Sequence, residues 1–161
     1  MITPVTVSEV IYDVSIILIN YNSSGYTQEC VQSILDKTES NLRFNIIVVD
    51  NGSAVDDYLK IKNLNEIDNV NVARSKFNLG FAAGNMFGLQ FTRAKYYFFL
   101  NNDCQFLNDC VTELYDFCEK NKDRIKLDMT IILESDSLGN DIATIKELKK
   151  QGWELVEYSE F

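Results

Sequence analysis

Residues 14–22 read VSIILINYN, a β-branched apolar run that ends in three polar residues. The run predicts a strand that is buried on both faces, and it is far too short to span a membrane. Runs of the same kind occupy residues 44–49, 70–73 and 96–100. Between these runs, apolar residues recur at helical spacing over residues 30–35, 55–61, 83–91 and 110–118.

Strands that alternate with helices in this way predict parallel β-α-β units. The predicted fold class is therefore α/β, with a mostly parallel sheet flanked by helices. The chain has 161 residues, enough for one domain and too few for two, so residues 1–161 are assigned to a single domain. On the helix predicted over residues 83–91, Met86, Phe87 and Phe91 are most simply core residues.

Composition narrows the function further. Fifteen basic and 24 acidic residues give a net charge of −9, which disfavours nucleic acid as a partner because the average field repels its backbone. The absence of His removes imidazole bases and most zinc sites. We recognise no signal peptide and no transmembrane segment, and therefore expect a cytoplasmic protein. Four cysteines without Cys-x-x-Cys spacing are predicted to be reduced thiols, namely Cys30, Cys104, Cys110 and Cys118.

Polar residues follow every predicted strand, at positions 20–22, 50–53, 74–80 and 101–103. The carboxyl ends of parallel strands meet at one edge of a sheet, and ligands of such folds bind there. From the residues alone, the sequence predicts a polar cleft for a small molecule at this edge.

Four of the segments also resemble a known family. SIILINYN at 15–22, IVVDNGS at 47–53, NLGFAAGN at 78–85 and FLNND at 99–103 look like the N-terminal, nucleotide-sugar-binding half of family 2 glycosyltransferases, closest to the rhamnosyltransferase-like branch. The order and spacing fit over residues 13–120. The resemblance implies the GT-A fold with its Rossmann-like nucleotide-binding half. It also implies inverting transfer of a sugar from a UDP- or dTDP-linked donor to a saccharide or lipid-linked acceptor, as in polysaccharide biosynthesis.

The resemblance implies roles for residues after the strands. Tyr21 would stack on the nucleobase and Asp50 would accept a hydrogen bond from it, while Arg74 and Lys76 would contact phosphate. The alternatives are a half-buried turn tyrosine, an Asx turn at Asp50 and a solvated basic loop. The other residues assigned to donor binding are Asn20, Asn51, Gly80, Asn85 and Asn102.

A metal role is implied for the last segment. Asp103 matches the final acid of the family's Asp-x-Asp motif, and Asn101 stands where many relatives have the first one. These residues would hold Mg²⁺ or Mn²⁺ against the donor diphosphate, because such ions take oxygen ligands and commonly use one or two carboxylates plus substrate phosphates. The alternative interpretation is a plain strand-exit turn.

Beyond residue 120 the resemblance fades. Residues 121–161 are predicted to add one β-α-β unit, with strands over 127–133 and 153–158 and a helix over 141–151. The acceptor half and its general base are not recognisable, so no catalytic residue is assigned. Three hypotheses remain: a glycosyltransferase, in a short or truncated form; a non-catalytic nucleotide-sugar-binding module that needs a partner; and a flavodoxin-like signalling domain.

Overall fold

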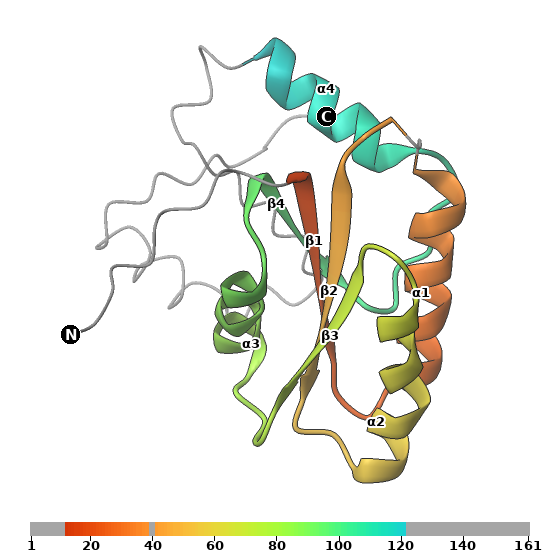
Figure 1. Ribbon diagram of the computed structural model, residues 1–161, viewed down its shortest axis with the longest axis vertical. Helices are drawn as coiled ribbons and strands as arrows, with labels where there is room; N and C mark the ends of the chain where they lie inside the picture. Colours follow the sequence, from red (N-terminus) through yellow and green to blue (C-terminus); the bar gives the residue numbers. More distant parts are fainter. Residues whose placement is uncertain (1–11, 39–40, 122–161) are drawn as a thin grey trace, which may run out of the picture.

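A computed structural model describes residues 12–38 and 41–121, in which four strands form one parallel sheet (Figure 1). Their spatial order is β3-β2-β1-β4, and each neighbouring pair is parallel. The predicted α/β class and parallel sheet are confirmed. The flavodoxin-like alternative is wrong, because that fold places its third strand, not its fourth, beside the first. The strands are β1 (Tyr12–Asn20), β2 (Phe44–Asn51), β3 (Val70–Ser75) and β4 (Ala94–Asn101).

Helices cover both faces of the sheet. On one face lie α1 (Ser24–Lys37), α2 (Val55–Ile61) and α4 (Cys110–Lys120), and on the other lies α3 (Phe81–Gly88) (Figure 1). Two 3-10 helices, Lys62–Glu66 and Leu89–Phe91, continue α2 and α3. No helix within the described residues is long and apolar enough to cross a membrane. The elements predicted over residues 121–161 fall outside the described part, apart from residue 121.

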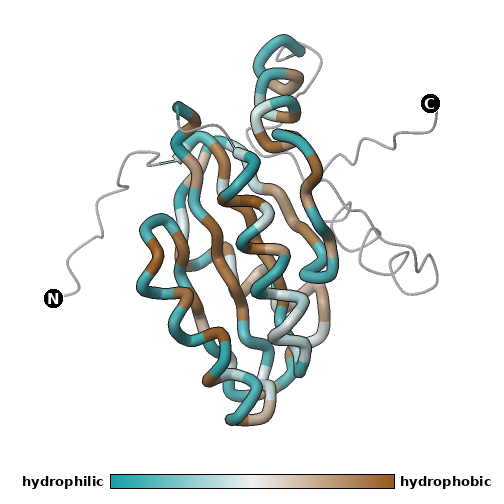
Figure 2. The backbone as a smooth tube through the Cα atoms, turned by 90° about the vertical axis from the view of Figure 1, so that its right-hand side faces the viewer, coloured by the Kyte–Doolittle hydropathy of each residue, from teal (hydrophilic) through white to brown (hydrophobic). Residues whose placement is uncertain are grey.

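The alternation of side chains along β1 builds the two halves of the core. Ile16 and Leu18 face α1, whereas Ile17, between them, faces α3, and all three are fully buried. Each such side chain contributes roughly 1.5–3 kcal/mol by leaving water. Hydrophobic stretches therefore run unbroken through the central strands, while the helices alternate between hydrophobic and hydrophilic turns (Figure 2).

The α3 side of the sheet differs from the sequence prediction. The α-helix ends at Gly88 and tightens into the 3-10 turn Leu89–Phe91, so the regular helical face does not reach Phe91. Phe87 packs on the sheet as predicted, but Met86 is 48% and Phe91 49% exposed. The core assignment of these two residues is therefore wrong.

The cysteines are reduced, as predicted. None of the four forms a disulfide, and Cys110 and Cys118 lie on the same helix. Burial, together with the neighbouring Cys104 and Asp103, raises the pKa of the Cys30 thiol to about 12. Cys30 is therefore a packing residue rather than a nucleophile, because only a thiolate is reactive.

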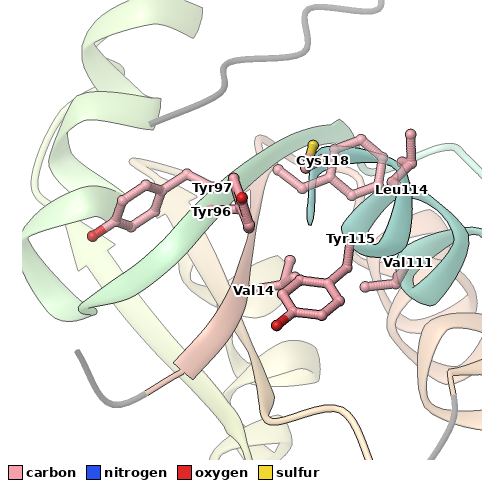
Figure 3. Close-up of a pocket in the computed structure, with 8 residues that line it drawn as sticks. Val14, Tyr96, Tyr97, Val111, Leu114, Tyr115 and Cys118 are labelled. Carbon is pink, nitrogen blue, oxygen red and sulfur yellow. The ribbon is translucent and has the colours of Figure 1, made fainter. Parts of the chain in front are cut away.

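A small apolar cavity of about 20 Å³ lies between β4 and α4 (Figure 3). Its walls include Val14 and Tyr96, each the third residue of its strand, so it lies towards the amino ends of the strands. It has room for about one water and offers that water no polar partners. This cavity is a packing gap on the opposite end of the sheet from the predicted site.

Two glycines offer a matched test of how closely α3 lies on the sheet. A Cβ at Gly88 would lie 2.7 Å from Ile17 Cγ2 and 2.9 Å from Val49 Cγ2, whereas a Cβ at Gly25 on α1 would meet nothing within 4 Å. We expect Gly88→Ala to destabilise the protein by about 1–3 kcal/mol through overpacking. Gly25→Ala should be neutral or stabilising by up to about 1 kcal/mol, since Ala favours helix. Denaturant unfolding of both variants tests this, and equal midpoints would contradict it.

Candidate functional site

The register of the sheet places three of the predicted site residues side by side. Asn20 pairs with Asp50 across β1 and β2, and Asp50 pairs with Arg74 across β2 and β3. In-register neighbours of parallel strands direct their side chains to the same face. Asn20 and Asp50 are both fully buried although they are polar, so the carboxyl edge of the sheet begins with an internal polar cluster.

The side-chain amide of Asn20 is the centre of this cluster. Its Nδ2 lies 3.1 Å from Asp50 Oδ1, 3.1 Å from Ser53 Oγ and 3.0 Å from Asp57 Oδ2. Ser53 Oγ also accepts from the backbone N–H of Asn22 at 2.9 Å. One amide therefore joins the end of β1 to the end of β2 and to the first turn of α2.

Arg74 closes the cluster from β3. Its Nε lies 3.1 Å from Asp50 Oδ2, its Nη2 donates to the carbonyl of Ser53 at 2.9 Å, and its guanidinium stacks 4.1 Å from the ring centroid of Tyr58. The side chain of Arg74 is 32% exposed, whereas Asp50 is inaccessible. The contact with Asp50 Oδ2 is an ion pair without hydrogen-bond geometry, so this buried oxygen keeps its capacity to accept.

The amino end of α1 joins the same cluster. The carboxylate of Asp57 accepts from the backbone N–H of Ser24 at 3.2 Å and so caps α1 from another element. Burial of Asp57 opposes its ionisation, but the hydrogen bonds from Asn20 and Ser24 outweigh burial and lower its pKa. From β4, Asn102 Nδ2 donates to Ser23 Oγ at 2.7 Å and to Thr27 Oγ1 at 2.8 Å.

Another group of predicted residues lies on the α3 side. Asn51 Nδ2 donates to Asn78 Oδ1 at 3.1 Å and to the carbonyl of Gly80 at 3.2 Å, while Asn51 Oδ1 accepts from the N–H of Leu79 at 2.9 Å. Gly80 has a φ of 77° at the start of α3, and Asn85 is buried in that helix. Asn51, Gly80 and Asn85 therefore lie apart from Asp50 because adjacent strand residues face opposite ways.

The remaining predicted residues are at the surface of this edge. Tyr21, at the end of β1, is 49% exposed, and Lys76 Nζ lies 5.6 Å from the ring centroid of Phe77. Asp103 is exposed beyond β4, and Asn101, the last residue of β4, is half-buried. Within residues 12–38 and 41–121, no hydrogen bond or ion pair uses the Asp103 carboxylate, and no group of three or more acidic, Cys or His side chains could hold a metal ion.

Asp103 and Asn101 fit a divalent metal ion that takes its other ligands from a bound small molecule. Mg²⁺ usually takes one or two carboxylates and fills its other positions with water and substrate phosphates. Asp103 offers one exposed carboxylate and Asn101 one amide oxygen, both hard oxygen donors at the strand exit.

Sequence reasoning missed three residues that build the cluster, namely Ser53, Asp57 and Thr27. One signal was available for Thr27. The apolar stripe of α1 contains Cys30, Val31 and Ile34, and helical spacing continues it backwards to Thr27 and Ser24, both of which are buried. A polar residue on an apolar stripe indicates a buried hydrogen-bonding role.

Comparison with known proteins shows the family of the chain. Residues 15–139 match glycosyl transferase family 2. The chain belongs to this family. It is 28% identical over 109 residues to an uncharacterized glycosyltransferase of Haemophilus influenzae, covering 67% of this chain and 33% of the relative. It is 31% identical over 115 residues to one of Rickettsia felis, covering 70% of this chain and 19% of the relative.

Solved structures agree on the fold of this family 2 chain. Residues 1–349 of TarS from S. aureus superpose with a TM-score of 0.59 at 20% identity, covering 68% of this chain and 33% of that one. A TarS complex with UDP-GlcNAc gives a TM-score of 0.57 at 24% identity, with 68% and 32% covered. The chain thus spans about a third or less of the relatives compared with it.

The lowered pKa of Asp57 gives a prediction about acid stability. A carboxyl with a lower pKa in the folded state stabilises fully above its unfolded pKa of about 3.9, and this contribution is lost as the pH falls through the folded value. Asp57→Asn should therefore lower the free energy of unfolding at pH 7 by about 1–2 kcal/mol, as measured by denaturant unfolding. Below about pH 4, the free energies of unfolding of the variant and the unmodified chain should converge.

The neighbouring Asp56 supplies the control. It is exposed in the same first turn of α2 and makes no hydrogen bond to the Asn20 cluster. Asp56→Asn should change the free energy of unfolding by no more than about 0.5 kcal/mol. A deficit in Asp57→Asn that is the same at pH 7 and pH 3 would show that its charge is not what stabilises the cluster.

Proposed function

We propose that this family 2 domain binds a nucleoside diphosphate sugar, UDP- or dTDP-linked, at the carboxyl edge of its sheet. The observation that carries the proposal is the joined cluster of Asn20, Asp50 and Arg74, beside the exposed Tyr21 and Asp103. The TarS complexes with UDP and UDP-GlcNAc support a uridine nucleotide as the first ligand to test.

In the proposed complex, the nucleobase stacks on Tyr21 and donates to Asp50. Tyr21 is half-exposed and directly follows Asn20, so its ring is available next to the cluster. Asp50 Oδ2 has no hydrogen bond although it is buried, which makes it an acceptor that gains by meeting an N–H. To reach this oxygen, the base would have to displace Arg74, whose Nε lies 3.1 Å from it.

The diphosphate is placed towards Asp103 in this proposal. There Mg²⁺ or Mn²⁺ would neutralise the charge that builds on the leaving diphosphate. Asn102 keeps its amide oxygen available, because its Nδ2 makes both of its hydrogen bonds. Arg74 and Lys76 stay proposed donor contacts, but on the nucleobase side, because β2 and β1 separate their strand β3 from β4 and Asp103. Arg74 would first have to exchange its ion pair with Asp50 or its hydrogen bond to Ser53.

The wider activity is also a proposal. We infer inverting transfer to a saccharide or lipid-linked acceptor in polysaccharide biosynthesis, in the cytoplasm, with the rhamnosyltransferase-like branch as the first relatives to compare. The acceptor and the general base are to be sought in the rest of the domain that relatives carry, since this chain spans about a third or less of their length.

Calorimetric titration with UDP and dTDP, with and without Mn²⁺, tests the binding. Asp103→Asn should abolish most of the gain in nucleotide affinity that Mn²⁺ provides, because one amide binds divalent ions weakly. Tyr21→Ala should weaken UDP binding about tenfold in both conditions, through lost stacking. Matched controls are Asp68→Asn, an exposed acid just before β3 at the other end of the sheet, and Tyr26→Ala, an exposed tyrosine on α1.

Two results would overturn parts of this proposal. Equal UDP affinity with and without Mn²⁺ would remove the metal role, and no binding of either nucleotide would remove the donor site. Release of free sugar or transfer from UDP-sugars by residues 1–161 separates a catalytic domain from a binding module that needs a partner.

A further inference from the structure

Thr27 occupies a central place in the cluster although it follows no strand and belongs to no family motif quoted above. It lies in α1 and is fully buried. Its Oγ1 donates to Asn20 Oδ1 at 2.8 Å and accepts from Asn102 Nδ2 at 2.8 Å. One hydroxyl therefore bridges the ends of β1 and β4, which are the two sides of the proposed donor site.

The shorter hydrogen bonds through Thr27 run in one direction, while its hydroxyl reaches the carbonyl of Ser23 only at 3.4 Å. Asn102 donates to Thr27, Thr27 donates to Asn20, and Asn20 donates to Asp50. Such a chain ends on a buried carboxylate, and each donor is polarised by the next, so its members strengthen one another. A longer route passes through Ser23, whose Oγ accepts from Asn102 at 2.7 Å but reaches Asn20 Oδ1 only at 3.4 Å.

We propose that Thr27 is a positioning residue that couples the nucleobase end of the site to the Asp103 end. Asp103 directly follows Asn102, so the hydroxyl that holds Asn102 also sets where the Asp103 turn stands relative to Asp50. A ligand that donates a hydrogen bond to Asp50 alters the hydrogen bond that Asp50 accepts from Asn20. This alters the hydrogen bond between Thr27 and Asn20, and through Thr27 the one that Asn102 donates. The inference rests on the proposed donor site.

The chain offers a close control on the same helix. Thr27→Val keeps the branched shape and removes the hydroxyl, whereas Thr27→Ser keeps the hydroxyl. Thr38, at the carboxyl end of α1, has a buried Oγ1 that makes no hydrogen bond, so Thr38→Val removes a hydroxyl that joins nothing. Thermal unfolding of each variant confirms that the fold is retained before ligands are added.

The first measurement is NMR of the Asn102 side-chain amide, identified by its loss in Asn102→Asp. The probe is uridine, which carries no phosphate and so acts only at the nucleobase end. Uridine should shift this amide in the unmodified chain, in Thr27→Ser and in Thr38→Val, but not in Thr27→Val. A shift of equal size in Thr27→Val would overturn the inference.

The second measurement is the factor by which Mn²⁺ raises UDP affinity in calorimetry. We expect Thr27→Val to reduce this factor about three- to tenfold, the effect of one lost hydrogen bond, with Thr27→Ser and Thr38→Val unchanged. An unchanged factor in Thr27→Val would overturn the coupling. If Thr27→Val does not fold, two other variants replace it, namely Thr27→Ala and the double variant of Ser23→Ala with Thr27→Ser. An unchanged Mn²⁺ effect on UDP affinity in Thr27→Ala would equally overturn the coupling.

Failure of the proposed function would look different. If the unmodified chain binds neither uridine nor UDP, the donor site itself is wrong, whatever the variants do. If the unmodified chain binds UDP and responds to Mn²⁺, any variant result bears on Thr27 alone.

Discussion

The buried side-chain amide of Asn20 is the constraint on which the carboxyl edge of the sheet depends. Its nitrogen lies within 3.1 Å of three acceptors, on Asp50, Ser53 and Asp57, although an amide has only two protons to donate. A buried acceptor that loses its donor costs about 1–3 kcal/mol, and an apolar residue in place of Asn20 would strand at least the buried Asp50 Oδ1. Because the acceptors come from β2 and the first turn of α2, one amide fixes the ends of three elements.

Charge explains the rest of the cluster. Two carboxylates, Asp50 and Asp57, converge on this one neutral amide, and Arg74 together with the amino end of α1 offsets them. A region that still holds an unfilled acceptor on Asp50 favours a ligand group that donates hydrogen bonds. In the proposed complex, a diphosphate would gain more beside Asp103, where a divalent cation would screen it, than beside the carboxylates of the buried Asp50 and the half-buried Asp57.

The sequence allowed the fold to be predicted because the central strands β1 and β2 are buried on both faces and therefore read as largely apolar runs. Strand ends were less predictable, since polar residues such as Asp50 and Asn51 still belong to the β2 ladder. The sequence also located the residues after each strand, Ser53 among them, but not the hydrogen bonds of Ser53 or the partners Asp57 and Thr27, whose contacts depend on how helices approach the sheet. Burial of Phe91 was wrongly predicted because the helix tightens after Gly88, whereas Met86 is exposed from within the regular helix α3.

Most of the polar residues at the strand ends make hydrogen bonds within the protein, and this limits which of them can bind a ligand. Asn20, Asn51 and the amide nitrogen of Asn102 already have protein partners, so a ligand gains little from them unless a bond is exchanged. The groups with unused capacity are the half-exposed ring of Tyr21, Asp50 Oδ2 and the carboxylate of Asp103. In the proposed site, the amides of these motifs would thus hold the strand ends in place, and the groups with unused capacity would meet the ligand.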